Sequence, residues 1–259
     1  MPGQLEGRVA VVTGAGRGIG RATAVALARE GADVACVART TSQLAETAAL
    51  VRAAGRRAQQ IEADIGEPGA PSLIAAKVLA ELGAIGIRVN NAATVEPAGP
   101  TATAGPEDWA RAVAVNLAGP VRLTLAVLNG MIEQGYGRIV NVSSAIAAAP
   151  GATPGLNAYA ASKAALEAHT LGLAAELAGT GVTVNILRPG PVDTAMPAWI
   201  LDQSPAQIGA GLYDRFMAMR DAGLMASPDQ PARMIADLVT GNSTGQIAGA
   251  GTPATISDN

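Results

Sequence analysis

The sequence has a single cysteine and a single histidine among its 259 residues, and this scarcity excludes two kinds of structural site. One cysteine cannot form an internal disulfide, and the two residues together cannot supply the ligand cluster of a Cys/His metal site. We therefore expect no metal centre. Cys36 is interpreted as a core residue of the second expected strand. His169 is interpreted as a packing or subunit-contact residue rather than a catalytic one.

The sequence also lacks a large excess of charge of one sign, and it lacks long apolar runs. The formal net charge is -3, and no basic cluster is present, so nucleic acid is not an expected partner. We see no charged and then apolar leader, and no apolar run that approaches the roughly 20 residues needed to span a bilayer. These observations predict a cytoplasmic protein without a membrane partner. Residues 1–259, with 49% hydrophobic content, suffice for one core, so we expect a single domain.

Short runs rich in Val and Ile alternate with alanine-rich helical stretches. Such alternation is typical of βαβ units, in which a parallel sheet is covered by helices on both faces. The predicted fold class is therefore α/β, with a doubly wound parallel sheet. The expected strands lie near residues 8–13, 33–37, 57–61, 86–90, 137–142 and 182–187.

A glycine-rich segment, Thr13-Gly14-Ala15-Gly16-Arg17-Gly18-Ile19-Gly20, follows the first expected strand. We expect a helix from about residue 18 to residue 30, followed by the second strand. Glycines allow the backbone to turn sharply and approach a pyrophosphate, and a helix N-terminus offers unpaired N–H groups to its charge. This order of elements predicts a dinucleotide site.

Tyrosine and lysine are both rare, yet Tyr159 and Lys163 lie four residues apart. On a helix these side chains share a face, so the ammonium of Lys163 can lie near the phenol and lower its pKa. A phenol with a lowered pKa is a usable proton donor. The pair alone also fits an ordinary surface pair on a helix, and the glycine-rich segment is what favours a functional site.

Together with further motifs, these segments resemble the short-chain dehydrogenase/reductase family, including its members similar to 3-oxoacyl-ACP reductases. The resemblance covers almost the whole chain and implies a Rossmann fold. It also implies hydride transfer between a nicotinamide cofactor and a carbonyl or alcohol substrate of low molecular mass. The motifs that carry it, in the family's order, are the glycine-rich segment, Asp64-Ile65, Asn90-Asn91-Ala92-Ala93, Asn116, Ser143-Ser144, Tyr159 with Lys163, and residues 188–194.

The resemblance implies a role for each matching catalytic residue. Ser144 would hold the substrate carbonyl oxygen, and Tyr159 would give that oxygen a proton. Lys163 would bind the nicotinamide ribose, and Asn116 would support a proton-relay water. Hydride transfer leaves negative charge on the oxygen, so a fixed hydroxyl and a positioned acid stabilise it. Ser143 competes with Ser144, and the position within the motif favours Ser144.

The resemblance also implies a set of cofactor contacts. Asp64 would accept a hydrogen bond from the adenine amino group, although capping a helix is an alternative role for it. The expected cofactor-binding residues are Gly14, Arg17, Gly18, Ile19, Gly20, Arg39, Asp64, Ile65, Asn90, Ala92, Lys163, Pro189, Gly190, Val192 and Thr194.

The end of the second strand indicates which coenzyme is used. NAD-dependent relatives carry an acidic residue there, which binds the ribose 2′-hydroxyl. This chain has Ala38 followed by Arg39. No carboxylate repels a 2′-phosphate, and Arg39 and Arg17 offer cationic forks, so NADP(H) is favoured over NAD(H). The alternative is that either arginine is a solvated surface charge.

Four features depart from the family pattern. Ala93 stands where glycine is usual, and Gly86 replaces a frequent aspartate. Arg88 interrupts a strand that should be buried, where an arginine is costly unless it is paired. Residues 151–154 lengthen the segment between Ser144 and Tyr159 by about two residues relative to the usual family spacing.

The segment at about residues 195–225 is the expected substrate lid. It carries three of the six aromatic residues, together with several methionines, which suits either an apolar pocket or subunit packing. We expect an NADP(H)-dependent carbonyl reductase or alcohol dehydrogenase acting on an apolar ketone or secondary alcohol. The alternatives are a 3-oxoacyl thioester reductase and a non-catalytic NADP-binding regulatory protein. The resemblance implies a homo-tetramer that assembles through helices near 107–133 and 157–178.

Overall fold

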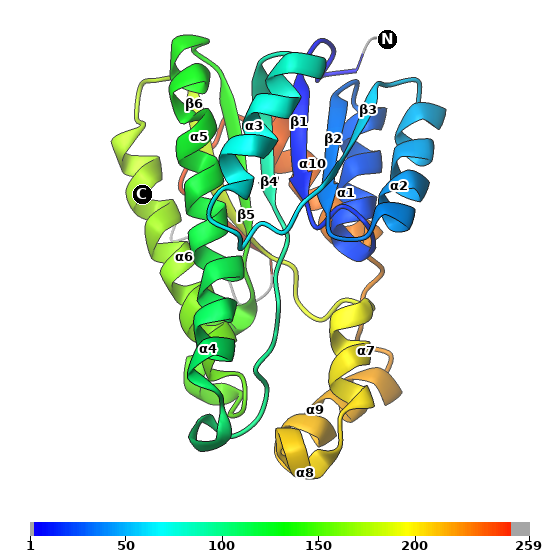
Figure 1. Cartoon of the computed structure of the whole chain (residues 1–259), viewed down its shortest axis with the longest axis vertical. Coiled ribbons are helices and arrows are strands. Elements are labelled where there is room, and N and C mark those ends of the chain that lie inside the picture. Colours follow the sequence, from blue (N-terminus) through cyan, green and yellow to red (C-terminus); the bar gives the residue numbers. More distant parts are fainter. Residues whose placement is uncertain (1–2, 250–259) are drawn as a thin grey trace, which may run out of the picture.

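The computed structural model describes residues 3–249, which contain a seven-stranded parallel sheet in the order β3-β2-β1-β4-β5-β6-β7 (Figure 1). The predicted doubly wound fold is confirmed, and each of the six expected strands is present within one residue at either end. The short seventh strand was not predicted. The strands are β1 (Val9–Thr13), β2 (Asp33–Ala38), β3 (Ala58–Glu62), β4 (Ile85–Asn90), β5 (Gly137–Val142), β6 (Val182–Arg188) and β7 (Ile247–Gly249).

Helices cover both faces of the sheet (Figure 1). One face carries α1 (Gly18–Arg29), α2 (Thr41–Ala53) and α10 (Asp229–Thr240), and the other carries α3 (Ala70–Glu81), α5 (Gly119–Glu133) and α6 (Asn157–Glu176). Beyond the carboxyl ends of the strands lie α7 (Ala195–Asp202), α8 (Pro205–Ile208) and α9 (Ala210–Asp221), and α4 (Pro106–Val113) precedes α5.

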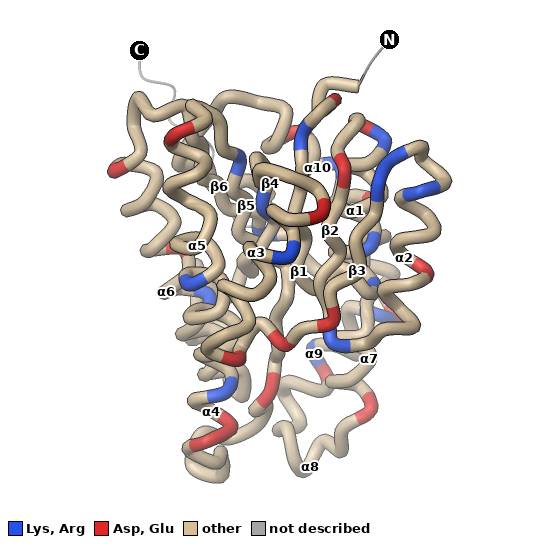
Figure 2. Tube along the Cα trace, turned by 45° about the horizontal axis from the view of Figure 1, so that its top comes forward, with Lys and Arg blue, Asp and Glu red and all other residues tan. Residues whose placement is uncertain are grey.

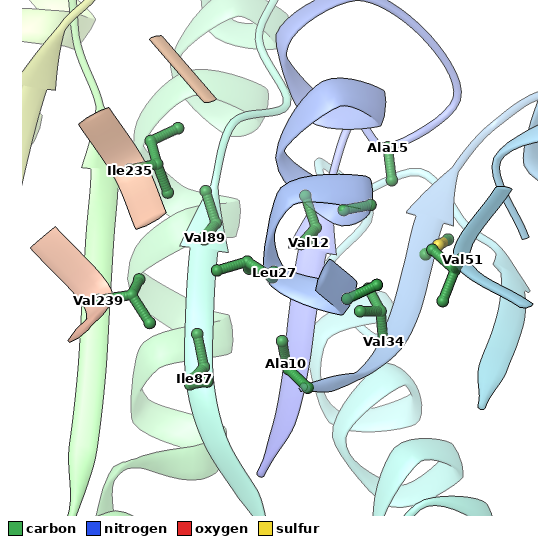
Figure 3. Close-up of a cluster of buried hydrophobic side chains, with 14 of the residues drawn as sticks. Ala10, Val12, Ala15, Leu27, Val34, Val51, Ile87, Val89, Ile235 and Val239 are labelled. Atoms are coloured by element: carbon green, nitrogen blue, oxygen red, sulfur yellow. The ribbon is translucent and has the colours of Figure 1, made fainter. Parts of the chain in front are cut away.

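The core follows from the two-residue repeat of a strand buried on both sides. In β1, Ala10 and Val12 pack under α1, α2 and α10, whereas Val9 and Val11 pack under α3, α5 and α6. Figure 3 shows the first of these clusters, in which side chains from the helices meet those of the strands. Cys36 belongs to it, and burial raises the pKa of its thiol to about 12. Its interpretation as a core residue is therefore confirmed.

One long helix runs over residues 106–133, because a π-helical turn at Ala114–Ala118 joins α4 to α5. By length and composition it could cross a membrane, so the expectation that no apolar stretch reaches that length is wrong. In this structure 44% of its most apolar window is buried inside the protein. The helix contributes Leu123 and Val127 to the core cluster under the sheet, as the core helix of a folded domain does.

Arg88 is completely buried between β4 and α5, in a position that sequence reasoning left unexplained. Its guanidinium donates hydrogen bonds to the Thr124 hydroxyl, to the Asn90 side-chain oxygen and to the Pro120 carbonyl, the last at a distance of 2.7 Å. No carboxylate pairs with it among the described residues, and burial lowers its pKa well below the ordinary value. Neutral acceptors therefore compensate the buried charge.

Gly86 leaves room for an aromatic side chain of the neighbouring segment. A Cβ at this position would lie 3.1 Å from the ring of Tyr136. That ring is fixed by two guanidinium groups, which lie over it at 3.7 Å for Arg8 and 4.4 Å for Arg138. The aspartate that the family often has here would crowd this cluster, which explains the departure.

Candidate active site

A cavity of about 670 Å³ opens at the carboxyl ends of the strands, where open α/β sheets place their ligands. The strand order reverses there, since β1 pairs with β2 on one side and with β4 on the other. The loop between β1 and α1 lines this cavity, and so do residues of α7 and α9. The cavity is long enough to bring residues of the glycine-rich loop and of the expected lid into one site.

The glycine-rich loop meets the cavity as expected through Gly14, Arg17, Gly18 and Ile19. Gly14 and Gly18 have φ values of 67° and 54°, which favour glycine. No side chain caps the N-terminus of α1 at Arg17, so its first N–H groups remain available to an anion. The structure therefore fits a pyrophosphate at this end of the cavity.

Gly20 is absent from the cavity lining, and its expected contact with the cofactor stays a prediction. A Cβ at Gly20 would lie only 2.2 Å from the Gly14 carbonyl oxygen. The missing side chain lets α1 start against the loop that it follows. Gly20 therefore shapes the phosphate-binding loop from behind.

Two arginines lie at the end of the cavity where a ribose 2′-phosphate would be expected. Arg17 and Arg39 both line it, and the Arg39 side chain is 73% exposed. Its nearest carboxylate is that of Asp64, at 3.9 Å. Because this contact is long and exposed, it holds the Arg39 guanidinium weakly. Arg39 is therefore available to a phosphate.

Asp64 and Ile65 line the cavity at the end of β3, as expected for the adenine side. The Asp64 carboxylate accepts the Gly66 N–H at 2.9 Å and a hydrogen bond from Arg111. The alternative role of capping a helix is not found, because α3 begins only at Ala70 after Gly69 and the carboxylate orders the turn at Gly66 instead. The contact with adenine stays a prediction. Arg111 also lines the cavity and was missed, because nothing in the sequence relates α4 to β3.

Asn90 was expected among the cofactor contacts, but its side chain is buried away from the cavity. Its Nδ2 donates a hydrogen bond to the Asn141 side-chain oxygen at 2.5 Å, and its own side-chain oxygen accepts one from Arg88. The segment after β4 lines the cavity from Asn91 to Glu96, and Ala92 is part of it as expected. Asn91 donates to the Thr13 carbonyl at 3.0 Å and so ties the loop to β1.

Three expected catalytic residues, Ser144, Tyr159 and Lys163, line one part of the cavity. Ser144 follows β5 and its hydroxyl hydrogen-bonds the Tyr159 side chain, while Tyr159 and Lys163 share one face of α6. Ser143 also lines the cavity, but its hydroxyl has no hydrogen-bond partner within residues 3–249. Of the two competing serines, Ser144 is thus the one that contacts the tyrosine.

Burial governs the protonation of this group. It raises the pKa of Tyr159 to about 12, and the hydrogen bond from Ser144 opposes that shift. It lowers the pKa of Lys163 to about 8, against the field of Glu167. The expected lowering of the tyrosine pKa by Lys163 is therefore not found, because desolvation dominates and the opposing effect comes from Ser144. The ammonium lies 5.8 Å from the phenol ring centre and donates to the Val142 carbonyl at 2.7 Å.

Asn116 lies in the π-helical turn and is buried outside the cavity. Its side-chain oxygen accepts the Thr94 N–H at 2.8 Å, and its amide donates to the Thr94 carbonyl at 2.8 Å and to Ser162 at 3.1 Å. The side chain thus holds Thr94, which does line the cavity. The water-relay role stays a prediction, and the structure adds a positioning role.

The loop after β6 supplies Pro189, Gly190, Val192 and Thr194 to the cavity, as expected. The loop begins at a buried ion pair, in which Arg188 donates to both carboxylate oxygens of Glu167, at 2.8 and 2.6 Å. This fork-to-fork pair fixes the end of β6 against α6.

The remaining wall is apolar and comes from the expected lid. Met196, Trp199, Phe216 and Met219 line it, and Trp199 and Phe216 pack in the same apolar cluster as Tyr159. Aromatic and methionine side chains of this segment thus form the cavity wall in the described chain. Thr153 of the lengthened segment lines the same wall.

The comparisons with known proteins agree with this geometry. The family model described as short chain dehydrogenase matches residues 8–204, so the chain belongs to that family. A short chain dehydrogenase of Pseudocercospora fijiensis is 43% identical over 76% of this chain, which spans 63% of that relative's length. The short-chain reductase protein NovJ of Streptomyces niveus is 38% identical, with 88% of this chain and 85% of the relative covered.

Solved structures show the same fold. An actinorhodin polyketide ketoreductase with NADPH superposes with a TM-score of 0.84 at 33% identity, covering 95% of this chain and 96% of that one. A xylitol dehydrogenase with bound NAD+ gives a TM-score of 0.84 at 28% identity, covering 94% and 97%. The protein is thus a short-chain oxidoreductase whose structural relatives bind nicotinamide cofactors.

Proposed function

We propose that the protein interconverts an apolar ketone and its secondary alcohol with NADP(H). The observation that carries the proposal is the contact between Ser144 and Tyr159 at the apolar end of a cavity whose other end is a glycine-rich phosphate loop. NADPH, when bound, supplies the hydride. A regulatory protein that only binds NADP would need no proton donor at that place, so catalysis is favoured.

The protonation states support carbonyl reduction. With a pKa of about 12, Tyr159 carries its proton at neutral pH and can give it to the developing alkoxide. The Ser144 hydroxyl donates to the same oxygen, where negative charge develops. Lys163 keeps its ammonium below pH 8 and would hold the nicotinamide ribose. The reverse oxidation uses the same groups, with Tyr159 as the base.

Arg17 and Arg39 support the preference for NADP(H), because both line the cavity. Position 38, where NAD-dependent relatives have an acidic residue, is an alanine. The NADPH of the polyketide ketoreductase agrees with it, while the NAD+ of the xylitol dehydrogenase shows that the fold accepts both. The likeness to the same ketoreductase also supports the alternative activity, which is the reduction of a 3-oxoacyl thioester.

Three further proposals concern the molecule as a whole. Residues 195–225 act as the substrate lid, since α7 and α9 form the apolar wall. We also propose a homo-tetramer in the cytoplasm. Leu125 and Ile132 of α5 and Leu171 of α6 are exposed and suit subunit contacts. The predicted single domain over 1–259 ends outside the described residues.

Steady-state kinetics on apolar ketones test the proposed chemistry. Tyr159→Phe should lower kcat by about 10²- to 10⁴-fold, because it removes the transferred proton, while the Kd for NADPH stays unchanged. Tyr213→Phe, in the lid but outside the cavity lining, is the matched control and should retain activity. Full turnover by Tyr159→Phe would contradict the assignment. NADPH binding without turnover on any ketone or thioester would favour the regulatory alternative.

The coenzyme preference is tested by Arg39→Gln. Losing a charged contact to the 2′-phosphate should lower the ratio of kcat/KM for NADPH to that for NADH by about tenfold or more. Arg122→Gln, an exposed arginine on α5, should leave the ratio unchanged. A wild-type preference for NADH would overturn the role given to Arg39.

A further inference from the structure

The substrate end of the cavity contains one cation that the proposed reduction does not use. Arg215 of α9 lines the cavity beside Phe216 and Met219, and it faces the same space as Trp199. The other lining cations have places in the proposed chemistry or at the cofactor end. Arg215 therefore needs a separate explanation.

One nitrogen of Arg215 is fixed by a backbone carbonyl from another segment of the chain. Its Nη1 donates to the Ala152 carbonyl at 2.8 Å, within the lengthened segment at residues 151–154. No carboxylate lies within ion-pair distance of Arg215 in the part of the chain that the structure describes. The guanidinium is thus anchored through one nitrogen, and the group as a whole has no counter-ion among the described residues.

An apolar surface separates this cation from the reacting groups. Tyr159, Trp199 and Phe216 belong to one apolar cluster, and all three line the cavity. A substrate that presents its carbonyl to Tyr159 would lay its apolar body along Trp199 and Phe216. Its far end would then come to the lid helix that carries Arg215.

Glu96, on the loop after β4, is a carboxylate that lines the same cavity. It is exposed and forms no ion pair with Arg215 among residues 3–249. An anion in this cavity therefore gains from Arg215 and is repelled by Glu96. This opposition gives the two residues opposite predicted effects on a charged substrate.

We propose that Arg215 binds a carboxylate carried by the substrate at the end remote from the reacting carbonyl. A guanidinium fork matches a carboxylate in geometry, and one N–H already held by Ala152 lowers the cost of ordering the side chain. The substrate class becomes apolar keto acids and the corresponding hydroxy acids. The proposal rests on the proposed function and narrows its substrate.

The test uses phenyl keto acids with increasing methylene spacing between ketone and carboxylate, each paired with its methyl ester. With NADPH, wild-type kcat/KM should be at least tenfold higher for the acid than for the ester at one spacing. Arg215→Gln should lower kcat/KM for that acid by about 10- to 100-fold and leave kcat/KM for its ester unchanged. Glu96→Gln should raise activity on the acid.

Arg220→Gln is the matched control, because Arg220 is on the same helix, pairs with Asp221 and does not line the cavity. Equal wild-type rates on acid and ester would overturn the proposal, and so would an equal loss on both in Arg215→Gln. The latter result would show that the contact with Ala152 only holds the lid in place. A preference for CoA thioesters that is insensitive to Arg215→Gln would also overturn it.

Binding separates this proposal from the proposed function. For at least one methylene spacing, the Kd of the hydroxy acid for the complex of protein and NADP+ should rise at least tenfold in Arg215→Gln, whether or not turnover is seen. If no ketone or thioester is reduced but this difference in Kd holds, the proposed reaction fails and the carboxylate site stands. If ketones are reduced and the difference is absent, the carboxylate site fails alone.

Discussion

At the residue scale, burial sets the protonation states of Tyr159 and Lys163. The spacing of Tyr159 and Lys163 placed both on one face of α6, because four residues make about one helical turn. Their pKa values depend on burial, which the spacing does not reveal. The structure removes both groups from water, and the neutral forms gain from it.

Lys163 should leave a signature in the pH dependence of stability. Its pKa falls from 10.5 to about 8 on folding, so the folded state is penalised while the ammonium is present. The penalty applies fully below about pH 8 and is relieved as the pH rises towards 10.5, because the unfolded chain binds more protons in that window.

The measurement is urea unfolding of wild type and Lys163→Met between pH 7 and 10.5. The free energy of unfolding of wild type should rise relative to the variant by about 3 kcal/mol across the window. Lys77→Met, which removes an exposed lysine of α3, should run parallel to wild type. A constant difference between wild type and Lys163→Met would show that the lysine is not desolvated.

Arg88 shows what sequence reasoning misses at this scale. Its acceptors Pro120 and Thr124 lie more than thirty residues away on α5, so no local pattern announces them. The same holds for Arg111, whose partner Asp64 lies at the end of another strand. Long-range polar contacts of this kind require the tertiary arrangement.

At the element scale, the predictable parts were those with a strong repeat. Five of the six predicted strands are buried on both faces, which gives runs rich in Val and Ile, whereas the edge strand β3 exposes Gln60 and Glu62. β7 has three residues and no such run. The π-helical turn at Ala114–Ala118 was also missed, since one extra residue in a helix leaves the apolar pattern almost unchanged.

The start of α1 gives a prediction at this scale. In Gly20→Ala the new Cβ meets the Gly14 carbonyl at 2.2 Å, so the loop or the helix must move. We expect a loss of about 1–3 kcal/mol in the free energy of unfolding and a rise of about tenfold or more in the Kd for NADPH.

Gly130→Ala is the matched change. Gly130 is an exposed residue of α5, and its new Cβ would find its nearest neighbour at 4.0 Å. It should raise the free energy of unfolding by about 0.5–1 kcal/mol without changing the Kd, because alanine loses less backbone entropy in a helix. Urea unfolding and NADPH titration check both variants. Equal behaviour of the two would contradict the packing role of Gly20.

At the scale of the whole molecule, the site is assembled by the fold from distant segments. Motif order predicted Ser144, Tyr159, Lys163 and the glycine-rich loop around one cavity, because parallel strands end at one edge of the sheet. The segment that contains α7 and α9 was predicted to be a lid, but the sequence did not predict how these helices are arranged around the cavity. The contact between Arg215 and Ala152 joins two segments whose sequences carry no motif.

The central claim, hydride transfer from NADPH to a ketone, is tested most directly by isotope transfer. The protein is incubated with an apolar ketone and NADPH that carries deuterium at both transferable positions of the nicotinamide ring, and the alcohol is analysed by mass spectrometry. The account predicts one deuterium on the former carbonyl carbon, with the hydroxyl proton derived from solvent through Tyr159. Alcohol without deuterium, or no alcohol from any ketone or thioester while NADPH binds tightly, would contradict it.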